Sequence, residues 1–301
     1  MTRELNIDSG GTGLRADLFL AVDVPLPWPK PVFNHQLLTG VTELLDSYST
    51  PTRLLASVPE DNNRLTVTAF QRKQTGHLDG SSLRRSQTTF HPSDLLDVLK
   101  GMLDEKKAED SIEIIQEEQA RELWVCTQGS HDVCCGSEGT ALSLEANKNL
   151  EVVKVRRVSH LGGHRFAPTA VTFPDGRMWS HLSMENLHEI FDGKPVEESL
   201  LKKCRGWSGS ETGPEQIAER EGLTLHGWNW DKYQRKTTVI SKEDSEIKVL
   251  VTGFPPGDEP EVKFEVIIND SGKTPIFSCD KAGDIPTKWQ TQYEVKTVDV
   301  Q

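Results

Sequence analysis

The sequence predicts a mixed α/β fold, and three observations support that prediction. Strand-like apolar runs alternate with amphipathic helical patterns over about residues 16–230, which is the order of elements in an α/β layer. Alternating apolar and polar residues over 231–301 then predict a β-rich C-terminal extension. The 301 residues are enough to bury one large core or two modest ones.

Composition and charge exclude several classes of protein. Hydrophobic residues make up 35% of the chain and charged residues 27%, which is ordinary for a soluble globular protein. The net charge of -12 argues against a nucleic-acid binder, because phosphates are neutralised by clustered lysines and arginines. No run approaches the roughly 18 apolar residues of a membrane span, and the first residues lack the pattern of a secretory signal. We therefore expect neither a nucleic acid nor a membrane as partner.

The cysteines indicate a reducing compartment. Five cysteines are an odd number, and three of them crowd between positions 126 and 135, which is a poor framework for disulfides. Thiols of this kind persist where glutathione and thioredoxin keep them reduced. The cytoplasm is the simplest expectation.

The first 115 residues predict a lead-in and one α/β unit. We expect a flexible lead-in over 1–15, and an N-terminal α/β unit over 16–115. In that unit the segments 51–59 and 64–73 predict strands, and a helix with one apolar face opens at Pro92. The stretch 75–89, TGHLDGSSLRRSQTT, predicts a polar loop.

Residues 116–230 predict a second layer with two conspicuous loops. The strand ELWVC runs into a cysteine loop, and the strand that follows the next helix ends at His160. A hairpin, a helix that begins at Ser183 and two further helices complete the layer. This order of elements is that of a thioredoxin-like layer. Both loops follow strand ends, where open α/β sheets place their sites.

The two loops together hold a candidate set of metal ligands. CTQGSHDVCCG at 126–136 contains Cys126, Cys134 and Cys135, and SHLGGHRFAPT at 159–169 contains His160 and His164. A single cysteine is usually a small buried hydrophobe, and a single histidine usually finds a hydrogen bond. Two thiolates and two imidazoles on glycine-rich loops favour a metal or iron–sulfur centre, and this spacing leaves the metal open. Vicinal cysteines cannot easily both face one metal atom.

These motifs resemble the sucrase/ferredoxin-like family over about residues 15–230. The matching segments are PLPWP at 25–29, RLLASVP at 53–59, CTQGSHDVCCG at 126–136, VSHLGGHRFAPTAVTFPDGRMWSHL at 158–182, and RG followed by PEQIAERE within 205–221. The resemblance implies a thioredoxin-like ferredoxin domain over 116–230 that carries the cluster loops. The extension over 231–301 lies beyond it.

The resemblance also implies a cofactor and its ligands. Family members of this type hold a 2Fe-2S cluster with two cysteines and two histidines, so Cys126, Cys135, His160 and His164 would be the ligands here. Cys135 is preferred to Cys134 because the family motif ends in Cys-Gly. The family often has His and Arg where this chain has Gln128 and Ser130.

The implied activity is one-electron transfer, in some conditions coupled to a proton on an imidazole. The chain would then be an electron carrier rather than an enzyme with its own substrate. Its partner would be an unidentified redox protein, either a reductase or an electron acceptor. Lys154, Arg156, Arg157 and Arg165 predict a basic patch near the second loop, which would dock that partner or stabilise the reduced cluster, or else form a solvated strand face.

Two alternatives remain open from the residues. A structural zinc domain that serves as a binding module uses the same ligand types. Hydrolysis of sucrose, suggested by the family's name, needs two carboxylates facing each other across a sugar pocket. Acids such as Asp175 and Glu185 are present, but the sequence shows no such pair.

Overall fold

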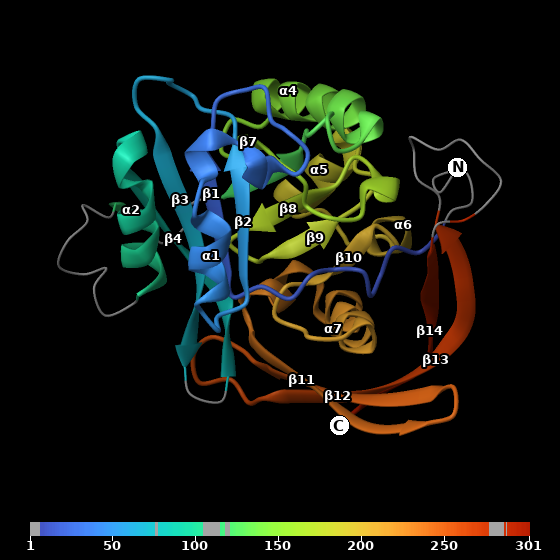
Figure 1. The fold of residues 1–301 in the computed structure, drawn as a ribbon. Coiled ribbons are helices and arrows are strands. Elements are labelled where there is room, and N and C mark those ends of the chain that lie inside the picture. The colour runs from blue at the N-terminus through green and yellow to red at the C-terminus, as the bar shows by residue number, and fades with distance from the viewer. Residues whose placement is uncertain (1–6, 76–77, 105–114, 118–120, 277–285, 287) are drawn as a thin grey trace.

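The protein has a mixed α/β architecture (Figure 1). The computed structural model describes residues 7–75, 78–104, 115–117, 121–276, 286 and 288–301. Within these residues, nine strands and several helices form a mixed layer, and four antiparallel strands follow at the C-terminus. The α/β prediction and the β-rich extension are therefore confirmed. None of the described helices combines the length and the apolar character that crossing a membrane requires.

The strands of the larger sheet lie in the order β10–β9–β8–β6–β7–β2–β1–β3–β4. Their bounds are β1 Leu18–Asp23, β2 Thr52–Ser57, β3 Thr66–Thr75, β4 Leu78–Thr89, β6 Glu122–Cys126, β7 Lys154–Val158, β8 Ala170–Phe173, β9 Arg177–Trp179 and β10 Cys204–Trp207. The short strand β5, Ile115–Glu117, pairs with β4 off this path.

The larger sheet consists of two units with the same topology. In the first, β1 is parallel to β2 and antiparallel to β3, and β3 pairs with β4. In the second, β6 is parallel to β7 and antiparallel to β8, and β8 pairs with β9. One helix joins the two parallel strands of each unit and another follows its hairpin. These helices are α1 Val41–Asp46, α2 Leu95–Leu103, α4 Thr140–Asn149 and α5 Met184–Phe191.

The two units join where β2 and β7 end. Ser57 is the partner of Val158 in an antiparallel pairing, and the Ser159 N–H donates to the Ala56 carbonyl at 2.8 Å. Aromatic rings from both units also share one core, with the Phe70 and Phe173 rings stacked at 4.0 Å between centroids. These interactions pack the N-terminal unit directly against the second layer.

One element differs from its prediction. The stretch 75–89 was expected to be a polar loop, but β4 occupies most of it and pairs with β3 as a long hairpin. Two side chains explain the difference. Leu83 is buried in the shared core, and Arg85 is buried because its guanidinium donates to Glu122 at 2.7 Å. A buried ion pair gives this strand an inward face that an apolar pattern does not reveal.

The C-terminal sheet curves around one helix (Figure 1). That helix is α7, Gly213–His226, which follows the short helix α6, Glu198–Leu201. Trp230, in the helical turn Gly227–Lys232 after α7, and apolar residues of the strands pack against it. The strands of this sheet are β11 Gln234–Glu243, β12 Glu246–Phe254, β13 Val262–Ile276 and β14 Lys288–Val300.

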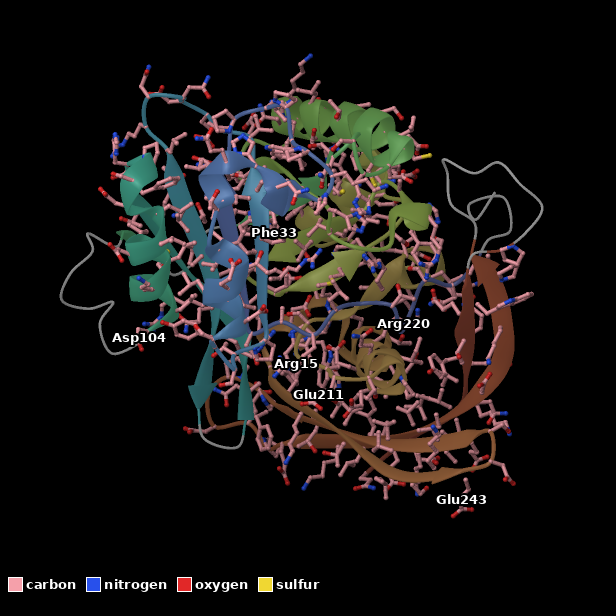
Figure 2. The ribbon with its side chains drawn as sticks, viewed as in Figure 1. Arg15, Phe33, Asp104, Glu211, Arg220 and Glu243 are labelled. Carbon is pink, nitrogen blue, oxygen red and sulfur yellow. The ribbon has the colours of Figure 1, made fainter. Side chains whose placement is uncertain are left out.

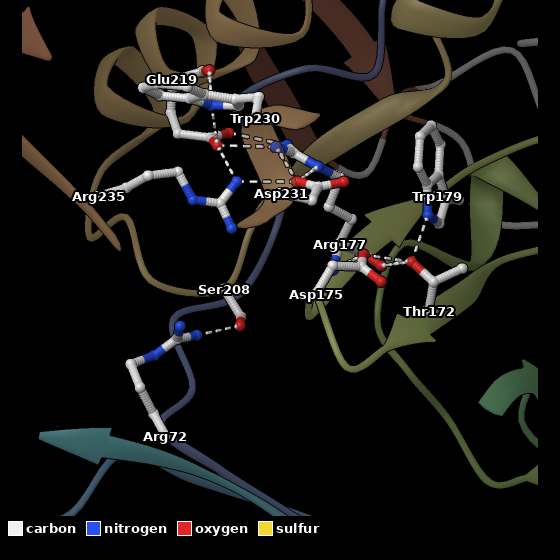
Figure 3. Close-up of polar contacts among 10 residues, drawn as sticks. All are labelled: Arg72, Thr172, Asp175, Arg177, Trp179, Ser208, Glu219, Trp230, Asp231 and Arg235. Carbon is white, nitrogen blue, oxygen red and sulfur yellow. Dashed lines mark hydrogen bonds and ion pairs between the residues drawn. The ribbon is translucent and has the colours of Figure 1, made fainter. Parts of the chain in front are cut away.

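A buried ion network fastens this extension to the layer (Figure 3). Arg177 of β9 donates to both carboxylate oxygens of Glu219 on α7, at 2.8 Å each. Arg235 of β11 donates to Glu219 at 2.7 Å, and both arginines contact Asp231. A layer strand, a helix and an extension strand therefore share one charged cluster.

The N-terminal segment lies against α7 and β10. Arg220 of α7, labelled in Figure 2, pairs with Asp8 at 2.7 Å, and the Gly13 N–H donates to Gln216 at 2.9 Å. The described part of the expected lead-in, from residue 7 on, is therefore held by specific contacts, whereas residues 1–6 lie outside the described part. The division into 1–15, 16–115, 116–230 and 231–301 stays a prediction.

Candidate metal centre

The two predicted loops lie side by side at the junction of the two units. The cysteine loop follows β6 and the histidine loop follows β7, and the two parallel strands end at the same edge of the sheet. The Thr127 N–H donates to the Val158 carbonyl at 2.9 Å, so the loops are in contact from their first residues. Sequence reasoning placed both loops correctly at strand ends.

Glycines and one aspartate fold the cysteine loop tightly. The Asp132 carboxylate accepts from the N–H of Cys134 at 2.9 Å and of Cys135 at 3.2 Å. A Cβ atom on Gly136 would lie 2.5 Å from the Cα of Gly129, and one on Gly139 would lie 2.0 Å from the Cys126 carbonyl oxygen. Larger side chains at these glycines would push the loop away from Cys126.

The folded loop brings two of its three thiols together. Cys126 is the last residue of β6 and is fully buried, and so is Cys135 at the start of a wide helical turn over Cys135–Gly139. The Cys135 thiol donates a hydrogen bond to the Cys126 sulfur. Cys134 is half-buried, and all four described cysteines, Cys204 included, are free thiols. Cys279 lies outside the described residues.

The Cys126 sulfur is surrounded by hydrogen-bond donors. The thiol of Cys135 contributes most to a pKa of Cys126 well below its ordinary value, against burial, which acts to raise it. The His160 ring and the N–H groups of Leu161 and Gln128 donate as well. The same thiol–thiol bond, together with burial, raises the pKa of Cys135. The site is therefore built to hold negative charge on Cys126.

The histidine loop turns on two glycines in the left-handed region. Gly162 has φ 78° and Gly163 has φ 68°, conformations that favour glycine. They lead from His160 into a short helical turn over His164–Phe166. The side chain of His164 lies outside the described part of the structure, so its place relative to Cys126 stays a prediction.

Of the four predicted ligands, the described structure brings three into contact. Cys126 is hydrogen-bonded to Cys135 and to His160. Across the described residues, no three His, Cys, Asp or Glu side chains are arranged to hold one metal ion. The donor set nevertheless fits an iron–sulfur cluster, because two soft thiols, an imidazole and backbone N–H groups meet at one buried place.

Gln128 ties both loops to the proline-rich segment. Its side-chain amide donates to the Pro29 carbonyl at 2.8 Å and accepts from the His160 N–H at 3.1 Å. Lys30 adds a second link by donating to the His131 carbonyl at 3.0 Å. The segment PLPWP, which follows β1, thus braces the cysteine loop. Gln128 is a departure from the family pattern, and sequence reasoning did not assign it this role.

Three arginines surround the loops, and two of them escaped sequence reasoning. Arg205 donates to the Gly162 carbonyl at 3.1 Å, and Arg53 donates to the His160 carbonyl. Burial lowers the pKa of Arg165 to about 10, and burial with the charges of Arg165 and Arg53 lowers the pKa of Arg205 to about 10. Arg53 and Arg205 each begin a segment of the matching text, RLLASVP and RG, and that position was the available signal.

The predicted basic patch does not form as one surface. Arg156 is buried and donates to Glu122 at 2.7 Å, so it belongs to the core. Lys154 pairs with Glu60 at 2.9 Å. Of the four residues in that prediction, Arg165 is the one whose charge acts on Arg205 beside the cluster loops.

The acids considered for sugar hydrolysis have other roles. Asp175 accepts from the Thr172 hydroxyl at 2.6 Å and from the Arg177 N–H at 3.0 Å, which closes the turn between β8 and β9. Glu185 is exposed in the first turn of α5. These contacts give the hydrolase hypothesis no support.

Comparisons with known proteins agree with the motifs. No curated protein and no solved structure matches the chain. The profile of one family, described as sucrase/ferredoxin-like, matches residues 12–206, which is more than half of the chain and includes both loops, Arg53 and Arg205. The chain therefore belongs to the sucrase/ferredoxin-like family.

Proposed function

We propose that this protein is an electron carrier with one 2Fe-2S cluster held by Cys126, Cys135, His160 and His164. The observation that carries the proposal is the contact of the buried Cys126 sulfur with the Cys135 thiol and the His160 ring. Two sulfurs and an imidazole are suitable iron ligands. His164 follows His160 across Gly162 and Gly163 and would supply the second imidazole.

The surroundings of Cys126 also suit a cluster. N–H groups of Leu161 and Gln128 point to its sulfur, and hydrogen bonds to the sulfurs are one means by which proteins tune such clusters. Complete burial and the thiol contact favour Cys135 over Cys134 as the second thiolate. Both loops are hydrogen-bonded to other segments, which keeps the ligands in place with little reorganisation.

The ligand set determines the chemistry. When bound, such a cluster supplies transfer of one electron between its oxidised and reduced forms. Two neutral imidazoles in place of two thiolates remove about two negative charges, so the reduction potential should lie above the roughly -400 mV of plant-type ferredoxins. The protein would exchange this electron with an unidentified reductase or acceptor, in a compartment that keeps its thiols reduced.

Anaerobic purification followed by spectroscopy tests the proposal. We expect a brown protein with two irons and two sulfides per chain, visible absorption that bleaches with dithionite, and a paramagnetic signal in the reduced form only. The Cys126→Ser variant should contain little iron. A colourless protein with one zinc per chain would instead establish the zinc-binding interaction module and overturn the electron carrier.

A further inference from the structure

Arg205 is a buried cation whose side-chain hydrogen bonds to described residues go to neutral oxygens. Its side chain is 2% exposed. It donates to the Thr12 hydroxyl at 3.0 Å, the Thr12 carbonyl at 2.7 Å and the Gly162 carbonyl at 3.1 Å. Neutral acceptors satisfy its N–H groups but leave its charge uncompensated.

Other buried arginines in the described structure have a carboxylate, which makes Arg205 an exception among them. The ion pairs are Arg72–Asp17, Arg85–Glu122, Arg156–Glu122, Arg177–Glu219, Arg220–Asp8 and Arg235–Glu219. Across the described residues, no carboxylate lies within ion-pair distance of Arg205, whereas each of the six arginines just named has one. A negative group other than a carboxylate is the physical alternative.

Like charges beside Arg205 make the imbalance larger. Arg53 and Arg165 are close enough for their charges to lower the pKa of Arg205, after burial, which is the largest cause. The sulfurs of Cys126 and Cys135, which would both be thiolates as cluster ligands, act on the pKa of Arg205 in the opposite direction. The charge of Cys126 also acts on Arg53, whose side chain donates to the His160 carbonyl. The positive charge therefore lies beside the two candidate cluster thiolates.

We propose that Arg205, together with Arg53, sets the reduction potential of this site by stabilising the more negative, reduced form of the bound cluster. The inference rests on the proposed electron-carrier function. With two thiolates and two neutral imidazoles, the oxidised centre has a net charge near zero. One electron from a one-electron donor converts one ferric ion to ferrous and adds one negative charge, without making or breaking a bond. A fixed positive charge favours that product over the oxidised form.

The two arginines are positioning and tuning residues rather than ligands, so the test must separate charge from hydrogen bonding. Arg205→Gln removes the charge and keeps an amide that can donate to the same carbonyls. Arg205→Lys keeps the charge and loses the planar guanidinium. Lys242→Gln, at an exposed position of β11, changes the net charge equally at a distance from the loops.

The reduction potential is measured by potentiometric titration with dithionite. The proteins are purified anaerobically and analysed for iron first. We expect Arg205→Gln to keep its iron and to show at least a tenfold lower ratio of reduced to oxidised cluster at a fixed potential, which is a shift of about 59 mV for one electron. Arg205→Lys should restore most of that ratio, and Lys242→Gln should match wild type.

Distinct results separate the possible failures. A wild-type protein without iron would overturn the proposed function itself. An iron-loaded Arg205→Gln protein with the wild-type reduction potential would overturn the role of the charge. So would an Arg205→Lys protein whose reduction potential is as low as that of Arg205→Gln. If Arg205→Gln does not hold iron, the Arg53→Gln variant becomes the test, because Arg53 donates to a single carbonyl and its replacement should disturb the fold little. An unchanged reduction potential in Arg53→Gln would refute the inference, and a lower one would support it.

Discussion

The ring of His131 stacks on the ring of His160, with centroids 3.7 Å apart and planes inclined by 18°. His131 belongs to the cysteine loop and His160 to the histidine loop, so this contact links the two loops, as do the bond of Gln128 to the His160 N–H and the bond of the His160 ring to the Cys126 sulfur. It also covers one face of a candidate ligand ring. His131 was not singled out from the sequence, because a histidine between Ser130 and Asp132 shows no pattern by itself.

Removal of this stack should make the cluster easier to extract. A stacked ring pair contributes about 1 kcal/mol, which corresponds to about a fivefold change in rate. We therefore expect His131→Ala to lose its visible absorption about fivefold faster than wild type in the presence of an iron chelator. His131→Phe keeps a ring and serves as the control. Equal rates for His131→Ala and wild type would show that the stack does not protect the site.

The cysteine register gives a second prediction. Cys126→Ser and Cys135→Ser should lose most of their iron, whereas Cys134→Ser should retain it, because the thiols of Cys126 and Cys135 are buried and in contact. Iron and sulfide analysis of the three variants is the measurement. If Cys134→Ser loses the colour of the cluster while Cys135→Ser keeps it, the second cysteine ligand is Cys134 and not Cys135.

The histidine ligands can be tested by changing their charge. His160→Cys and His164→Cys should still hold a cluster, since thiolate binds iron well, but each adds a negative charge and should lower the reduction potential. His188→Cys, on the surface of α5, is the matched control because its side chain is 39% exposed. Unchanged colour and potential in the variants at 160 and 164 would remove these histidines from the ligand set.

Local patterns were enough to predict the loops but not their neighbours. The apolar strand ELWVC and the strand before His160 are short-range signals, so the ends of β6 and β7 follow from them. Arg53, Arg165 and Arg205 come from β2, the histidine loop and β10, which are far apart in the sequence, so their charges interact only in the folded chain. The pairing of β2 with β7 rests on a single partner pair, Ser57 with Val158, which no sequence period encodes.

The same reasoning explains why β4 was missed. A strand is recognised by alternating apolar residues, and β4 has the buried Arg85 at a position where the pattern expects an apolar side chain. Its partner, Glu122, opens a strand in the other unit. When a residue is buried because it pairs with a charge in a distant segment, its burial can be predicted only if the positions of both segments are known.

Trp230 gives a prediction about the C-terminal extension. A Cβ atom on Gly222 of α7 would lie 2.1 Å from the Trp230 indole, so this glycine makes room for the ring that docks the extension. Alanine in place of a helical glycine ordinarily stabilises a helix by about 1 kcal/mol. Here we expect Gly222→Ala to destabilise the protein by about 1–3 kcal/mol, because overpacking outweighs that gain.

Urea unfolding followed by tryptophan fluorescence measures this effect. Thr224→Ala lies on the exposed face of the same helix and should stay within about 0.5 kcal/mol of wild type. A Gly222→Ala protein that is more stable than wild type would mean that Trp230 moves aside at no cost.

The last prediction concerns acid stability and Glu122. Burial acts to raise the pKa of Glu122, but the charge and hydrogen bond of Arg156, the Trp124 N–H and the charge of Arg85 together hold it below its ordinary value. A carboxyl group whose pKa is lower in the folded state than in the unfolded state stabilises the fold above its unfolded pKa of about 4.3. That contribution is lost as the pH falls through the folded pKa.

Glu122→Gln should therefore lower the free energy of unfolding most at neutral pH. It leaves two buried guanidinium groups without their shared carboxylate, and we expect the free energy of unfolding at pH 7 to fall by about 3–5 kcal/mol. The difference from wild type should shrink below about pH 4, because wild-type Glu122 then becomes protonated. Glu60→Gln is the matched control: Glu60 pairs with Lys154 at 2.9 Å but is 68% exposed, so its loss should cost less than about 1 kcal/mol at every pH. Denaturant midpoints measured from pH 7 down to pH 3 are the test. If the difference in midpoint between wild type and Glu122→Gln stays constant over this range, the ionised carboxylate is not the source of the stability.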